Sequence, residues 1–154
     1  MSAKWASFEP GKVKLEAGLF QQRSELNRAY LLSLKPDNLL QNHYLEAGIG
    51  NFRQIRNTSM GDTSNGDDRH WGWESPTCQL RGHFLGHWLS AVSRAYASTG
   101  DLQLKLRADE IVQELARCQS ENGGEWVFSI PEKYLERIAA GKQPGPLTTP
   151  FTKP

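Results

Sequence analysis

Two long stretches of helical periodicity, separated by a single tight turn, occupy the middle of this 154-residue chain. In residues 79–99 and again in residues 101–123, apolar residues recur at the spacing of the buried face of an amphipathic helix. They are Leu80, Phe84, Trp88, Val92 and Ala95 or Tyr96 in the first stretch, and Leu104, Ala108, Ile111 or Val112 and Leu115 in the second. Gly100 ends the first stretch, and Asp101 is a suitable N-cap for the second. We therefore predict two helices that form an antiparallel hairpin.

Weaker helical signals flank this hairpin. Residues 24–34 place apolar side chains four positions apart, with Ser24 as the expected N-cap. Residues 37–48 and 131–140 are predicted to form two shorter helices, the second with Pro131 at its first position. The first twenty residues suit an extended arm or a short strand. Because helices and strands do not alternate, the predicted fold class is all-α, built from helical hairpins.

Size and charge exclude several classes of protein. A chain with 38% hydrophobic and 23% charged residues fits one ordinary globular domain. Its net charge of +1 gives no electrostatic footprint for nucleic acid or an anionic membrane, so we expect neither as a partner. The N-terminus has no apolar signal-peptide core, and no run of about 18 apolar residues occurs. A cytoplasmic location is the default expectation.

The two cysteines, Cys78 and Cys118, are expected to be free thiols. They lack C-x-x-C spacing, and two cysteines are too few for a disulfide framework or for a zinc site built on cysteine alone. No redox or structural metal function is therefore predicted for them.

Residues 81–90, RGHFLGHWLS, contain two Gly-His pairs four residues apart. On a helix His83 and His87 share one face and could chelate zinc. The H-E-x-x-H form of that site needs a glutamate after the first histidine, where this chain has Phe84. A third ligand would have to come from Glu74 or His70, across a polar loop. A metalloprotease is thus disfavoured, and metal binding of another kind remains an alternative.

The glycines of the same motif carry a second signal. Each glycine inside a helix costs roughly 1 kcal/mol relative to alanine, so Gly82 and Gly86 suggest that a backbone or a ligand presses on this helix. The nearby W-G-W-E segment adds the aromatic Trp73 and the carboxylate of Glu74. Aromatic faces beside imidazoles and carboxylates are a combination that binds sugars. The alternative, that both histidines are ordinary polar groups on a closely packed helix, stays open.

Several motifs together resemble one enzyme family. They are GWE at 72–74, LRGHFLGHWLSA at 80–91, YASTGD at 96–101, IVQEL and CQ in the following helix, NGG at 122–124 and SIPE at 129–132. In this order they are similar to glycoside hydrolase family 127, which includes β-L-arabinofuranosidases. The resemblance spans roughly residues 8–143.

The resemblance implies a six-hairpin α/α toroid followed by β-sandwich domains, and retaining hydrolysis of L-arabinofuranosides. It implies a cysteine nucleophile on a zinc ion held by cysteines and a glutamate, with a second glutamate as acid/base. It also places His83 and His87 in the sugar-binding subsite, bordered by Trp73 and Glu74. Their role would be to hold and orient the sugar.

The family's nucleophile, zinc ligands and acid/base lie further along the sequence, and Cys78 and Cys118 match none of them. We therefore expect residues 1–143 to be the N-terminal part of the toroid, with roughly two to three of its hairpins. No catalytic residue, metal ligand or cofactor is expected in this chain, although zinc is implied for the full-length family.

The last eleven residues, 144–154, read PGPLTTPFTKP and break the helical pattern. At this point the family continues with a segment like W-A-P-Y-Y-T-L-H-K. One coding of that segment, read one base late, translates as G-P-L-T-T-P-F-T-K, which is residues 145–153. We hypothesise a frameshift near codon 144 that produces an aberrant tail.

Three functional hypotheses follow from the sequence. The first is a glycoside hydrolase by descent, carrying substrate-binding residues and inactive as this chain alone. The second is a non-catalytic helical module that binds carbohydrate or another partner through the same residues. The third is an unrelated zinc-dependent helical protein. The sequence predicts no oligomeric state.

Overall fold

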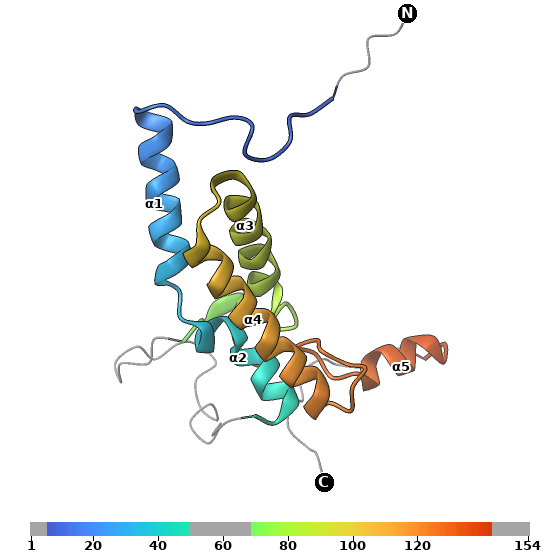
Figure 1. Ribbon diagram of the computed structural model, residues 1–154. Coiled ribbons are helices and arrows are strands. Elements are labelled where there is room, and N and C mark those ends of the chain that lie inside the picture. Colours follow the sequence, from blue (N-terminus) through green and yellow to red (C-terminus); the bar gives the residue numbers. More distant parts are fainter. Residues whose placement is uncertain (1–5, 50–68, 143–154) are drawn as a thin grey trace, which may run out of the picture.

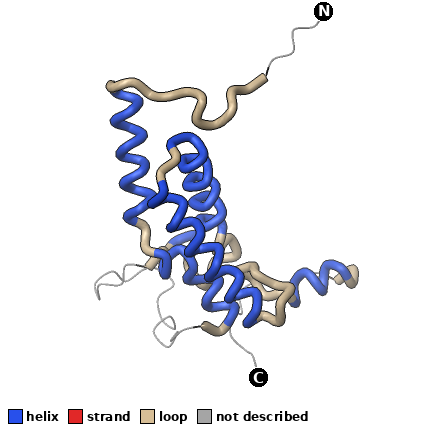
Figure 2. The backbone as a smooth tube through the Cα atoms, viewed as in Figure 1, coloured by secondary structure: helices blue, strands red, loops and turns tan. Residues whose placement is uncertain are grey.

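The computed structural model describes residues 6–49 and 69–142. Within these ranges it is helical and contains no strand, so the predicted all-α class is confirmed (Figure 2). The elements in chain order are α1 (Leu19–Ser33), α2 (Pro36–Ala47), the 3-10 helix η3 (Gly72–Glu74), α3 (His83–Thr99), α4 (Leu102–Glu121) and α5 (Lys133–Ala139). Residues 6–18 form an arm without regular structure. Residues 144–154 lie outside the described residues, and so does most of 57–72, NTSMGDTSNGDDRHWG, whose polar composition predicts a loop. Closure into a toroid stays a prediction.

The central hairpin is present as predicted. Helices α3 and α4 pack against each other and are joined through Gly100, which has a left-handed backbone with φ 72° (Figure 1). The Gly100 N–H donates to the carbonyl of Tyr96 at 2.7 Å, and the Asp101 carboxylate accepts from the Gln103 N–H at 2.9 Å. These two caps satisfy backbone groups that a helix end leaves unpaired.

Three predicted helix starts were wrong. Helix α1 begins at Leu19, because nothing between Gly18 and Ser24 breaks a helix, and Ser24 lies in its interior. Residues 79–82 form turns instead of helix, because Gly82 has φ 87°, so α3 starts only at His83. Helix α5 starts at Lys133, after Pro131, whose carbonyl accepts from the Tyr134 N–H at 3.2 Å.

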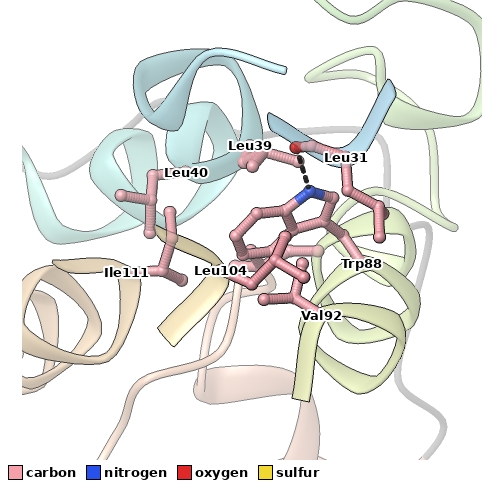
Figure 3. Close-up of a cluster of buried hydrophobic side chains, with 8 residues drawn as sticks. Leu31, Leu39, Leu40, Trp88, Val92, Leu104 and Ile111 are labelled. Carbon is pink, nitrogen blue, oxygen red and sulfur yellow. Dashed lines mark hydrogen bonds between the residues drawn. The ribbon is translucent and has the colours of Figure 1, made fainter. Parts of the chain in front are cut away.

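The apolar core lies where α1 to α4 meet. Trp88 is at its centre, 2% exposed, and its indole Nε1 donates to the Leu31 carbonyl at 3.0 Å, which ties α3 to the end of α1 (Figure 3). Each buried aliphatic side chain contributes about 1.5–3 kcal/mol. The remaining buried members are Leu31, Leu39, Leu40, Leu85, Val92, Leu104 and Ile111. This core fixes the direction of α3, the helix that carries both predicted histidines.

Apolar side chains also lie exposed on the outer faces of the helices. On α1 they are Leu19, Phe20, Leu26 and Tyr30, and on α4 they are Leu102, Leu106 and Val112. No helix of the described part is long and apolar enough to cross a membrane.

Candidate functional site

Two amide side chains of α2 hold the segment that precedes α3. Gln41 Nε2 donates to the carbonyls of His70 and Glu74 at 2.7 and 2.9 Å, and Gln41 Oε1 accepts from the His70 N–H at 3.0 Å. Asn42 Nδ2 donates to the Glu74 carbonyl at 2.8 Å. Residues 70–74 are therefore fixed by side chains in place of a regular backbone ladder.

The Glu74 carboxylate caps the first turn of α3. It is 9% exposed; Oε2 accepts from the Gly82 N–H at 2.7 Å, and Oε1 accepts from the Phe84 N–H at 2.8 Å. Asn42 Nδ2 lies 3.2 Å from Oε2 as a further donor. A negative charge here also interacts favourably with the helix dipole. The residue expected to border a sugar is thus turned into the protein, and its sugar contact remains a prediction.

Gly82 is glycine because of its backbone and its neighbour. Its φ is 87°, and a Cβ placed on it would lie 2.0 Å from Ser129 Oγ. Ser129 Oγ donates to the Arg81 carbonyl at 2.9 Å, and Arg81 Nε donates to the Ser129 carbonyl at 2.9 Å. We predicted that a backbone or a ligand presses on Gly82; the close neighbour is instead the side chain of Ser129. The prediction that Gly82 is inside the helix was wrong, because Gly82 is the N-cap.

Gly86 differs from Gly82 in both respects. It lies in the second turn of α3, and nothing described lies within 4 Å of the position its Cβ would take. Neither backbone conformation nor packing within the described residues requires glycine here, although it costs roughly 1 kcal/mol relative to alanine. No residue that the structure describes fills the space beside Gly86.

His83 and His87 are both exposed in the first two turns of α3, on either side of Gly86 in the sequence. His83 Nδ1 lies 2.9 Å from the Leu80 carbonyl. Because a carbonyl only accepts, this contact is a hydrogen bond when Nδ1 carries the proton. In the tautomer with its proton on Nδ1, His83 offers a lone pair at Nε2.

Trp73 lies beside Glu74 in η3 but faces outward. Its side chain is 76% exposed, which leaves an aromatic face free to stack on a ligand. The structure describes no ring contact between Trp73 and either His83 or His87. Of the four predicted site residues, Glu74 binds the backbone of the residues on either side of His83, without a described contact to the His83 side chain. His87 lies one turn further along α3, and Trp73 is exposed next to Glu74.

A group of buried polar residues on α2 was not predicted from the sequence. Asn38, Gln41 and Asn42 recur at helical spacing, a pattern that equally fits a solvated face, so it did not reveal their role. His43 is 6% exposed, and its Nδ1 has no hydrogen-bond partner among the described residues. Burial lowers the pKa of His43 to about 4, although the Glu74 carboxylate opposes this change. His43 is therefore neutral at neutral pH.

A cavity of about 800 Å³ lies at the other end of α3. The arm, α1, the end of α3 and the start of α4 line it, and Arg28 pairs with Asp101 at its edge. It contains none of the predicted site residues. The candidate site is therefore the start of α3.

A comparison with protein families decides the family of this chain. Residues 12–133, most of its length, match the family model described as "Beta-L-arabinofuranosidase, GH127 catalytic domain". The chain belongs to the GH127 family. Searches of curated proteins and of solved structures found no match. The GH127 match includes η3, α3 and α4 and ends at the first residue of α5, so it contains the entire candidate site.

The described residues of this GH127 chain do not fit a zinc site. They contain no group of three or more histidine, cysteine, aspartate or glutamate side chains that could hold a metal ion. Cys118 is fully buried in α4, and burial raises the pKa of its thiol to about 11, which disfavours the thiolate that zinc binds. Cys78 Sγ accepts from the Leu80 N–H at 3.4 Å. No chemical step through zinc is therefore derived from these residues.

Proposed function

We propose that this GH127 chain contributes the sugar-binding wall of a catalytic domain that acts on L-arabinofuranosides. The observation that carries the proposal is the open surface around Gly86, flanked by the exposed His83 and His87. A glycine that neither backbone nor packing requires is explained by a ligand that approaches the helix at that point.

The exposed groups suit a sugar. His83, with Nδ1 against the Leu80 carbonyl, can accept a hydrogen bond at Nε2. His87 offers a second imidazole one turn away, and Trp73 supplies an aromatic face. Hydroxyl groups donate and accept hydrogen bonds, and the apolar face of a sugar ring stacks on indole. Such groups raise reaction rates by orienting the substrate and not by breaking bonds.

Bond cleavage is assigned by this proposal to other residues. The family resemblance implies a zinc-bound cysteine nucleophile and a glutamate acid/base, and no residue of this chain matches either. We expect the chain alone to touch L-arabinose weakly and to release none from arabinofuranosides.

Two measurements on the ¹⁵N-labelled chain test the proposal. In an NMR titration with millimolar L-arabinose, we expect shifts confined to Trp73, His83, Gly86 and His87, and no saturable heat in calorimetry. His83→Ala and His87→Ala should each abolish these shifts, and Gln113→Ala on α4 should not. Saturable heat would favour the alternative, a self-sufficient carbohydrate-binding module. If α3 shows no shifts, or if the shifts are unchanged in both histidine variants, the proposed function and the carbohydrate-binding alternative are both contradicted.

A further inference from the structure

We propose that Glu74 is a positioning residue that fixes the ring orientation and the tautomer of His83. The proposal rests on the proposed function, because it assigns a role to the His83 sugar contact. It differs from the sequence prediction, which had Glu74 itself at the sugar.

The carboxylate binds the residues on both sides of His83. One oxygen accepts from the Gly82 N–H at 2.7 Å and the other from the Phe84 N–H at 2.8 Å. The carboxylate therefore holds the Arg81–Gly82 and His83–Phe84 peptide groups, and the backbone between them, which includes His83, has little freedom to rotate. Asn42 holds Glu74 in turn, through the backbone carbonyl at 2.8 Å and Oε2 at 3.2 Å.

The turn before α3 supplies the second constraint. Arg81 donates from its N–H to the Cys78 carbonyl at 3.3 Å, and its side chain is 2% exposed against Ser129. This turn places the Leu80 carbonyl 2.9 Å from His83 Nδ1. The proton is therefore held on Nδ1, and Nε2 is left as an acceptor on an exposed ring.

A fixed acceptor determines which ligands fit. A sugar hydroxyl can donate to Nε2, whereas an ether or carbonyl oxygen at the same point cannot and would lose that bond. The site is thus specific for a free hydroxyl opposite His83. The buried Glu74 carboxylate contributes to this specificity without touching the sugar.

The experiment is ¹⁵N NMR of the imidazole nitrogens at alkaline pH, without sugar. In the wild type we expect His83 as the Nδ1–H tautomer. In Glu74→Gln, whose side-chain amide cannot accept from both N–H groups, we expect a mixture of tautomers. Amide exchange at Gly82 and Phe84 should rise at least about tenfold. The control variant Glu125→Gln removes an exposed carboxylate elsewhere. It should change neither the His83 tautomer nor the amide exchange of Gly82 and Phe84.

Unchanged methyl shifts of Val92 and Ile111 would show that the Glu74→Gln core is intact. Should that variant fail to fold, the wild-type spectrum decides alone, because an Nε2–H tautomer of His83 overturns the proposal. An unchanged Nδ1–H tautomer in folded Glu74→Gln also overturns it. The proposed function can fail while the positioning role holds. If His83 is the Nδ1–H tautomer but L-arabinose does not perturb its signals, the positioning role is supported and the sugar contact is refuted.

Discussion

At the scale of single residues, backbone conformation and Ser129 require glycine at position 82, whereas neither backbone conformation nor described packing requires it at position 86. Gly82→Ala forces a side chain into a left-handed backbone and against Ser129 Oγ, only 2.0 Å away. We expect it to lower the free energy of unfolding by about 2–4 kcal/mol. Gly86→Ala fills open space on a regular helix and should raise stability by up to about 1 kcal/mol. Urea unfolding of both variants tests this, and equal effects would refute the distinction.

His43 makes stability depend on pH. In the folded protein the pKa of His43 is about 4, below its ordinary value of 6.5. Between these two pH values His43 is protonated in the unfolded chain and neutral in the folded chain. The contribution of His43 to the free energy of unfolding is therefore complete above pH 6.5. It is lost as the pH falls towards 4, by up to about 3 kcal/mol in total. Urea unfolding at several pH values between about pH 7 and pH 5 gives the free energy of unfolding as a function of pH. In His43→Gln this free energy should fall less steeply with decreasing pH than in the wild type. An identical slope in both proteins would contradict the assignment.

At the scale of elements, the N-cap of α4 is predicted to stabilise the hairpin more than a surface ion pair on the same helix. Asp101 accepts from the Gln103 N–H and pairs with Arg28, whereas Asp109 pairs with Lys105 in solvent. Asp101→Ala should cost about 1–2 kcal/mol, and Asp109→Ala about 0.3–0.5 kcal/mol. Thermal unfolding followed by circular dichroism compares the two. Equal costs would show that the cap is unimportant.

The helix ends were predictable from the sequence where one residue determines them, as Gly100 and Asp101 do. The starts of α1 and α3 were not, because periodicity continues through Leu80 while Gly82 ends helical geometry. Spacing alone predicted that His83 and His87 lie on one helix, but not that both are exposed. The role of Glu74 did not, because its hydrogen bonds to Asn42 and Gly82 depend on how α2 packs, which no local pattern encodes.

At the scale of the whole molecule, the exposed apolar side chains of α1 and α4 predict self-association. Burial of such surface between chains is favourable in water. Sedimentation velocity should show species larger than a monomer as the concentration rises about a hundredfold. The double variant Leu26→Glu and Leu106→Glu should shift the distribution of sedimenting species towards the monomer. The control, Ser24→Glu and Gln113→Glu, adds the same charge at polar positions and should not; a wild type that stays monomeric would refute the prediction.

The contacts that secure the start of α3 have a consequence for the order of folding. The α3–α4 turn closes through neighbours in sequence, whereas the Asn42–Glu74 and Arg81–Ser129 bonds join residues 32 and 48 positions apart. Closing longer loops costs more chain entropy, so α3 should grow backwards from Gly100 and complete its first turn last. Any ligand held by that turn therefore also acts as a folding partner, since it stabilises the part of the helix that the chain itself finishes latest.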